Sequence, residues 1–158
     1  MKKKIAIIGS GIAGVVLANL LKINSNFEFI VYEKRDILNL EEGFGIQLSV
    51  NSISILNKIG FDQLNKNDKH HPSKLDFYSI NYNKICDLDL TKFNSPNAKY
   101  TTLKRSTLIK FLKNKLLSNS IIFRKKIKYV EEINEKKSSY YWIWYSRTYF
   151  SMSFTNEF

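Results

Sequence analysis

The chain has 158 residues, enough for one ordinary hydrophobic core, so we expect one domain or part of a larger one. Its formal net charge is +11, from 25 Lys and Arg against 14 Asp and Glu. Because the basic residues are scattered along the whole length, they favour a solvated basic surface over nucleic-acid binding, with a phosphate-binding surface as the alternative. The single cysteine, Cys86, excludes an internal disulfide and a cysteine-based zinc site, and it fits a reducing, cytoplasmic location.

The first 33 residues predict a strand over 3–9, a helix over 12–23 and a second, parallel strand over 27–33. The basic residues of 1–4, followed by apolar ones, imitate a signal peptide, but glycines and Asn19 interrupt the apolar run. No segment reaches about 18 consecutive apolar residues, so we expect no membrane-spanning helix. The pattern therefore predicts a βαβ unit.

A G-x-G-x-x-G motif, Gly9-Ser10-Gly11-Ile12-Ala13-Gly14, lies between the first predicted strand and the helix. Gly9 permits a tight turn, Gly11 leaves room for a pyrophosphate beside the backbone, and Gly14 lets helix and strand approach closely. The start of the helix directs unpaired N–H groups and the positive end of its dipole at the phosphates. The motif in this position predicts a dinucleotide-binding site.

The second predicted strand ends on an acidic residue, Glu33, about 20 residues after the glycines, as a dinucleotide-binding unit requires. We expect its carboxylate to accept hydrogen bonds from the adenosine ribose and to repel a 2′-phosphate, so that FAD and NAD fit better than NADP. Ser10, Lys34 and Arg35 are candidates for further polar contacts to the phosphates and the adenosine. The alternative is that these polar side chains are simply solvated.

The remaining predicted elements are shorter and complete an α/β, Rossmann-like fold with a parallel sheet and a small β-hairpin insertion. Ile53, Leu56 and Ile59 share one helix face, which Gly60 ends, and Leu108 seats a later helix in the core. In chain order we expect a loop over 34–47, a helix over 52–59, strands over 75–80 and 84–90 around a turn at 81–83, a loop over 94–98, a helix over 106–117, and strands over 120–123 and 126–131.

Three segments after the βαβ unit resemble one family in the same order. Residues 43–51 read G-F-G-I-Q-L-S-V-N and resemble the G-x-G-I-x-L-x-P-N segment of class A FAD-dependent aromatic-ring monooxygenases, the salicylate and p-hydroxybenzoate hydroxylase-like superfamily, with Val50 in the proline position. Residues 53–61 resemble the family's next helix, which ends in L-G-[LF]. Residues 103–112 resemble its R-x-x-L-x-x-x-L helix start, so the chain looks like the N-terminal portion of such an enzyme.

The resemblance implies non-covalent FAD, with NADH or NADPH as electron donor, and hydroxylation of an aromatic or other unsaturated small molecule by O₂. It implies that Gly45, Ile46 and Gln47 lie near the flavin and that Arg105 reaches back to the FAD pyrophosphate or ribose; the alternatives are a flexible loop and a surface arginine. The cofactor carries the difficult chemistry, so no catalytic residue is assigned. The pair at 70–71, both His, is not expected to bind metal, and Cys86 is expected to be buried.

The resemblance ends near residue 137, which predicts two parts: 1–137, the N-terminal part of an FAD-binding domain, and 138–158, an aromatic-rich tail. Nine aromatic residues in the tail mark a sharp change of composition. We interpret the tail as a frameshift or premature end, or alternatively as a real strand that pairs with the sheet or with a partner. Two other functions stay open: a truncated, inactive FAD- or nucleotide-binding fragment, and an NAD-dependent dehydrogenase. The dehydrogenase accounts for Glu33 and the glycines but not for Arg105. The oligomeric state and the substrate are not predicted.

Overall fold

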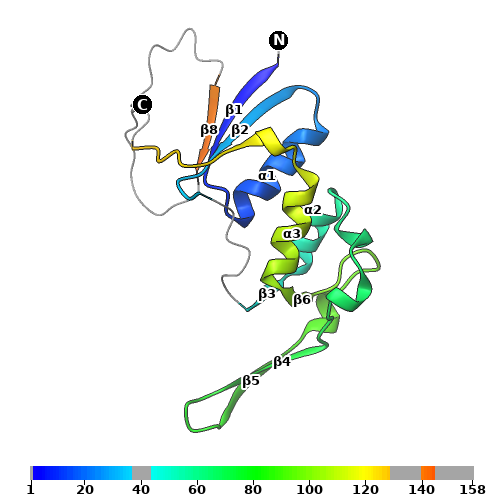
Figure 1. The fold of residues 1–158 in the computed structure, drawn as a ribbon. Coiled ribbons are helices and arrows are strands. Elements are labelled where there is room, and N and C mark those ends of the chain that lie inside the picture. Colours follow the sequence, from blue (N-terminus) through cyan, green and yellow to red (C-terminus); the bar gives the residue numbers. More distant parts are fainter. Residues whose placement is uncertain (1, 37–43, 129–139, 145–158) are drawn as a thin grey trace. The chain divides into compact units, whose positions relative to one another are not determined.

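The protein, described here from a computed structural model that covers residues 2–36, 44–128 and 140–144, forms two compact units (Figure 1). The first unit combines Met1–Asn39 with Leu112–Phe158, and the second is Leu40–Phe111. The first contains a parallel sheet, and the second contains antiparallel strand pairs and helices. This mixture confirms the predicted α/β class.

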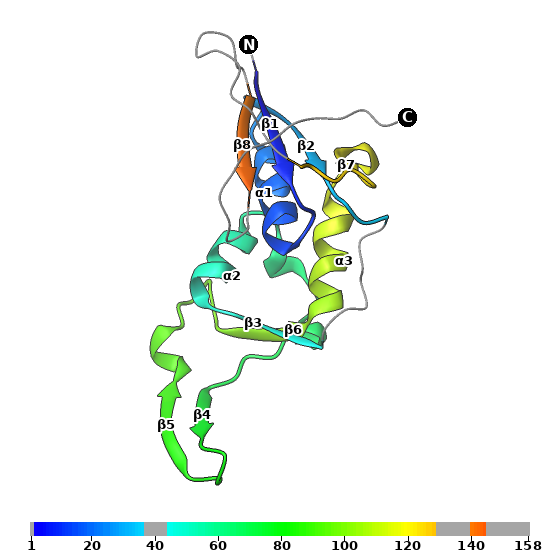
Figure 2. The same cartoon turned by 90° about the vertical axis from the view of Figure 1, so that its left-hand side faces the viewer.

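The first unit begins with the predicted βαβ arrangement. β1 (Lys3–Ile8) and β2 (Phe27–Tyr32) pair in parallel, and α1 (Ile12–Ile23) connects them. β7 (Ile121–Ile122) adds a short parallel strand beside β2, as Figure 2 shows. α1 occupies the predicted residues, because its apolar side chains recur at helical spacing and Gly9, with φ +96°, turns the chain after the strand before it.

The fourth strand of the sheet comes from the aromatic segment. β8 (Tyr140–Trp144) pairs in parallel with β1, so the strand order is β7-β2-β1-β8. We gave two interpretations of this segment, a frameshift or premature end and a real strand. These five residues form a strand that pairs with the sheet. The proposed frameshift and the boundary at residue 137 stay predictions, because 129–139 and 145–158 lie outside the described residues.

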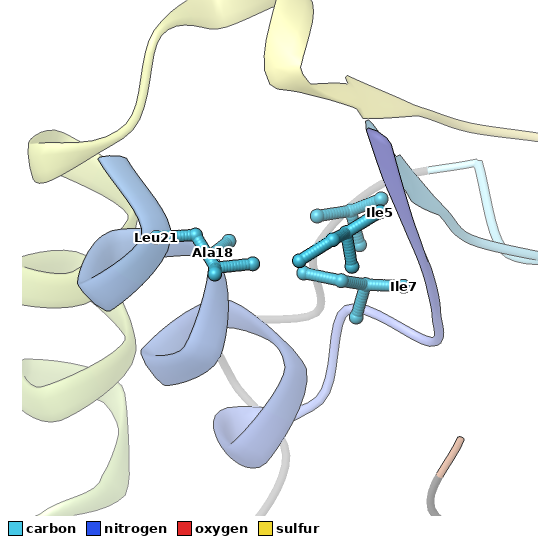
Figure 3. Packing of buried hydrophobic residues seen from close by; sticks show 5 residues of the cluster. Ile5, Ile7, Ala18 and Leu21 are labelled. Atoms are coloured by element: carbon cyan, nitrogen blue, oxygen red, sulfur yellow. The ribbon is translucent and has the colours of Figure 1, made fainter. Parts of the chain in front are cut away.

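The core of the first unit lies between α1 and one face of the sheet. Figure 3 shows Ile5 and Ile7 of β1 pointing toward Ala18 and Leu21 of α1. Val31 of β2 completes this buried cluster. Further apolar side chains pack partly buried against it, namely Leu17, Phe27, Phe29, Leu116 and Ile121. Burial of this apolar surface holds the βαβ unit together.

A buried asparagine joins α1 to the end of α3 (Arg105–Lys115), whose last residues belong to the first unit. The Nδ2 group of Asn19 donates to the carbonyl oxygens of Val15, at 2.8 Å, and Leu112, at 3.0 Å. Asn19 is only 3% exposed, so these bonds satisfy its amide donors away from water. The sequence gives no sign of this link.

The second unit contains a strand pair that sequence patterns miss. β3 (Gly45–Leu48) pairs antiparallel with β6 (Thr101–Lys104), although we expected a loop over 34–47 and no strand at 101–104. Each strand has only four residues and finds its partner more than 50 residues away, so local periodicity does not reveal it. The expected strand over 126–131 is also wrong for 126–128, which have no regular structure, while 129–131 lie outside the described residues.

The helices of the second unit match the predicted apolar faces. α2 (Val50–Asn57) buries Ile53 and Leu56, and Gly60 follows with φ +84°, a conformation that favours glycine and ends the helix. Leu108 of α3 is fully buried. Short 3₁₀ helices complete the described elements, at Phe61–Gln63, Lys66–Asp68, Leu90–Phe93 and Ser118–Ser120.

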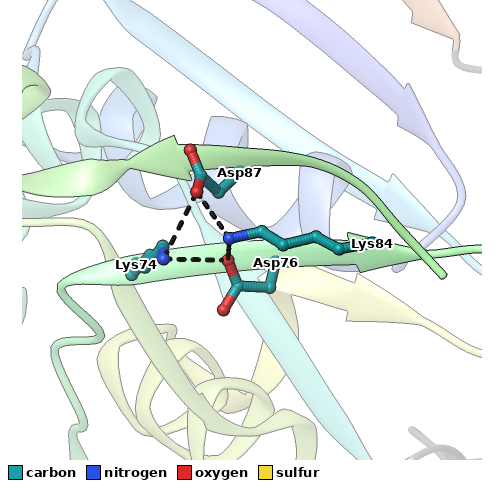
Figure 4. Close-up of polar contacts among 4 residues, drawn as sticks. All are labelled: Lys74, Asp76, Lys84 and Asp87. Carbon is teal, nitrogen blue, oxygen red and sulfur yellow. Dashed lines mark hydrogen bonds and ion pairs between the residues drawn. The ribbon is translucent and has the colours of Figure 1, made fainter. Parts of the chain in front are cut away.

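The predicted hairpin is formed by β4 (Lys74–Tyr78) and β5 (Lys84–Asp89), which pair antiparallel. Asp76 and Asp87 lie directly opposite each other, a repulsive arrangement for two carboxylates. As Figure 4 shows, the Nζ groups of Lys74 and Lys84 lie between them, at 2.6 to 3.3 Å from the carboxylate oxygens. Hydrogen bonds to Asp87 and Asp76 hold the pKa of Lys84 above its ordinary value.

A matched pair of isoleucine substitutions tests the core of the first unit. Ile7 is 1% exposed, whereas Ile23, at the end of α1, is 64% exposed. We expect Ile7→Ala to lower the free energy of unfolding by about 2–5 kcal/mol and Ile23→Ala by about 0.5 kcal/mol or less, measured by urea denaturation. Equal effects of the two substitutions would contradict this assignment of the core.

Candidate cofactor-binding site

The glycine motif forms the turn between β1 and α1. Gly9 has φ +96°, a backbone conformation that residues with a side chain rarely adopt. Its N–H donates to the carbonyl oxygen of Tyr32 at 2.8 Å. Gly11 is the residue before the first turn of α1, and its carbonyl accepts the first helical hydrogen bond, from Val15, at 3.0 Å. The motif therefore lies in the strand-to-helix turn that the sequence predicts.

The start of α1 carries the features of an anion-binding helix end. No side chain caps the helix at Gly11, and its first turn contains no acidic residue. The N–H groups of Ile12, Ala13 and Gly14 belong to the first turn, where a helix offers no carbonyl partner. These donors and the positive end of the helix dipole favour a negatively charged ligand such as a pyrophosphate.

Two glycines of the motif serve different purposes. A Cβ atom at Gly14 would lie 2.1 Å from the carbonyl oxygen of Gly9, so only glycine lets α1 pack this closely on the end of β1. A Cβ atom at Gly11 would meet no atom within 4 Å. The lack of a side chain at Gly11 is therefore not needed for packing, and it leaves open space beside the helix start.

Glu33 follows β2 and is hydrogen-bonded to the glycine turn. Its Oε2 atom accepts from the Ser10 N–H at 2.8 Å and from the Ser10 hydroxyl at 2.7 Å, and its Oε1 atom accepts from the Arg35 N–H at 3.0 Å. Burial raises the pKa of Glu33, but the hydrogen bonds from Arg35 and Ser10 outweigh it, so that the pKa lies below its ordinary value. A buried, ionised carboxylate thus lies next to the turn.

A later segment of the chain fixes the position of Glu33, which sequence reasoning missed. The N–H of Lys125 donates to the carbonyl oxygen of Glu33 at 2.9 Å, and the N–H of Arg124 donates to that of Arg35 at 3.1 Å. Arg124 has φ +58°, and its guanidinium pairs with exposed Asp36 at 3.3 Å.

The other candidate residues lie in the second unit. Gly45, Ile46 and Gln47 form most of β3, where the side-chain amide oxygen of Gln47 accepts from the hydroxyl of Tyr100 at 2.9 Å. The N–H of Arg105, the first residue of α3, donates to the carbonyl oxygen of Phe44 at 3.1 Å. The structure thus brings the start of α3 to β3, and it brings Ser10, Glu33 and Arg35 together in the first unit.

The histidine pair and the cysteine lie in the second unit. The Nδ1 atom of His71 contacts the Tyr100 carbonyl oxygen and the Thr101 hydroxyl, at 3.2 and 3.1 Å, within a shallow hollow of the second unit. Cys86 is exposed on β5, so the expectation of a buried cysteine is wrong, because the hairpin face that carries it is not covered.

Among the described residues, no group of three metal-ligating side chains occurs, and no helix has the length and apolar character to cross a membrane.

Comparisons with known proteins agree with this geometry. Residues 7–39 match the NAD(P)-binding Rossmann-like domain, and no curated protein sequence matches the chain. The tetrameric form of 2-methyl-3-hydroxypyridine-5-carboxylic acid oxygenase has a TM-score of 0.63 at 21% identity, over 82% of this chain and 33% of that one. For 2,6-dihydroxypyridine-3-hydroxylase from Arthrobacter nicotinovorans, the TM-score is 0.60 at 14% identity, over 84% and 31%.

A third solved structure, CtdE in complex with FAD and a substrate, has a TM-score of 0.63 at 14% identity, over 83% of this chain and 32% of that one. The chain thus spans about a third of the length of these proteins. The chain therefore has the fold of the corresponding part of these proteins, in agreement with the order of its motifs.

A glycine pair tests the packing of the turn. We expect Gly14→Ala to lower the free energy of unfolding by about 3 kcal/mol, because its Cβ would collide with the Gly9 carbonyl. Gly11→Ala should change it by about 1 kcal/mol or less, because its Cβ enters open space. Urea denaturation of both variants measures the difference, and a Gly11→Ala variant as unstable as Gly14→Ala would contradict the two assignments.

The Glu33 carboxylate makes a pH-dependent contribution to stability. Because its folded-state pKa lies below the ordinary 4.5, the contribution is present above that value and is lost as the pH falls through the folded-state pKa. We expect Glu33→Gln to destabilise the protein by about 1–3 kcal/mol at pH 7, and this deficit to shrink in more acidic solution. Denaturation at several pH values measures it, with exposed Glu28→Gln on β2 as a control; an unchanged deficit at acidic pH would exclude the ionised form as the cause.

Proposed function

We propose that this chain is the FAD-binding part of a flavin-dependent monooxygenase. The observation that carries the proposal is the open space at Gly11 next to the uncapped start of α1. Packing does not require glycine there, so a close ligand is the physical reason for it. In the proposed complex, the N–H groups at the start of α1 donate to the FAD pyrophosphate and the Glu33 carboxylate accepts from the adenosine ribose.

The charge at the ribose end favours FAD or NAD over NADP. Hydrogen bonds from Ser10 and Arg35 keep Glu33 ionised, and this negative charge would repel a 2′-phosphate. Lys34 and Arg35 follow directly and are proposed to face the adenosine side. Among these two cofactors, the fold shared with CtdE, which was solved with FAD, favours FAD.

We further propose an activity for the whole protein. FAD, when bound, supplies the redox and oxygen chemistry, with NADH or NADPH as the reductant and an aromatic or other unsaturated small molecule as the substrate. We propose Gly45, Ile46, Gln47 and Arg105 as further FAD-binding residues, because their segments resemble the family's motifs. The free thiol of Cys86 supports a reducing, cytoplasmic location. The named activities of the oxygenase and the hydroxylase support the reaction class.

Cofactor titrations test the proposal. We expect FAD to bind the protein, followed by quenching of flavin fluorescence, and Gly11→Ala to weaken binding about tenfold or more, because its methyl group fills the space of the pyrophosphate. Ser54→Ala, an exposed change in α2, serves as the control. Tight binding of NAD without FAD would assign a dehydrogenase instead, and equal FAD affinity for the protein and its Gly11→Ala variant would exclude the glycine turn as the site.

A further inference from the structure

The contact between Ser10 and Glu33 closes the place where a ribose would bind. Both hydrogen bonds from Ser10 end on the same atom, Oε2 of Glu33, at 2.8 Å from the N–H and 2.7 Å from the hydroxyl. Ser10 is 7% exposed and Glu33 is 8% exposed. Little of the carboxylate surface is therefore available to a ligand while the Ser10 hydroxyl stays in this position.

The hydrogen-bonding capacity of the Glu33 carboxylate limits how many donors of a ligand it can accept. Two carboxylate oxygens together offer about four acceptor positions. Ser10 fills both positions on Oε2, and the Arg35 N–H fills one on Oε1. A single position remains for a ligand. A ribose with two adjacent hydroxyl groups offers two donors, so one of the protein donors has to leave before both can bind to Glu33.

The three protein donors differ in their freedom to leave. The N–H groups of Ser10 and Arg35 belong to the backbone, in the glycine turn and in the residues held by the 124–125 segment. The Ser10 hydroxyl, by contrast, is released by one rotation about χ1, which leaves the backbone unchanged. The hydroxyl is therefore the donor that a ribose can replace without disturbing the turn.

We infer that the Ser10 hydroxyl occupies the acceptor position of Glu33 that a nucleotide ribose needs, and that a ligand with free 2′- and 3′-hydroxyl groups displaces it on binding. This inference rests on the proposed nucleotide site. In the structure, the Ser10 hydroxyl pairs the buried carboxylate. In the complex, a ribose hydroxyl takes over this hydrogen bond, so Ser10 lowers the affinity for every nucleotide that uses the bond.

A comparison of two nucleotides in two proteins tests the competition. ADP carries the adenosine ribose and pyrophosphate of FAD but needs no flavin pocket, and 2′,3′-dideoxy-ADP lacks both competing hydroxyl groups. We expect Ser10→Ala to bind ADP about three- to tenfold more tightly than the unmodified protein, by calorimetry, because no hydroxyl has to be displaced. The affinity for 2′,3′-dideoxy-ADP should be equal in the two proteins.

Controls separate this inference from the proposed function. Ser10→Gly should repeat the result of Ser10→Ala, and Ser54→Ala, which removes an exposed hydroxyl in α2, should leave both affinities unchanged. Unchanged or weaker ADP binding by Ser10→Ala would overturn the inference while leaving the nucleotide site intact. If neither nucleotide binds to any of these proteins at millimolar concentration, the proposed function fails, and the inference fails with it.

Discussion

The close approach of α1 to the end of β1 is the constraint on which the first unit depends. Gly14 meets the carbonyl of Gly9 at a distance that leaves no room for a side chain, and this contact sets where α1 begins. The apolar side chains of Ile7 and Ala18 can then meet across the same interface. One steric condition therefore places both the core of the unit and the start of α1.

Polar groups in this unit are paired by parts of the chain that are distant in sequence. Glu33 is held by the glycine turn 23 residues earlier and by Lys125 much later, and Asn19 bonds to Leu112 across 93 residues. Buried polar groups need such partners, because an unpaired one loses its hydrogen bonds to water without replacement. Backbone N–H groups of Ser10 and Arg35 thus hold the Glu33 carboxylate, together with one side-chain donor, the Ser10 hydroxyl.

The second unit relies on different interactions. Its helices bury apolar faces, with Phe61 and Phe111 packed edge to face at 5.6 Å between ring centroids, while its hairpin is largely exposed and carries a cross-strand network of charges. Exposed ion pairs contribute little stability, so this network adds little to the stability of the second unit. The part shared with the proteins of similar fold makes up about a third of their length and, at 82–84% of this chain, includes residues of both units.

The sequence by itself determined the βαβ unit, the glycine turn, the acidic residue after the second strand and the apolar faces of α2 and α3, because local periodicity and glycine chemistry specify them. Only the tertiary structure decided the pairing of β3 with β6, the addition of β8 to the sheet, the exposure of Cys86 and the hydrogen bonds from Ser10 to Glu33. These features depend on contacts between residues far apart in the chain, and no local pattern encodes which distant partner a strand or a carboxylate will find.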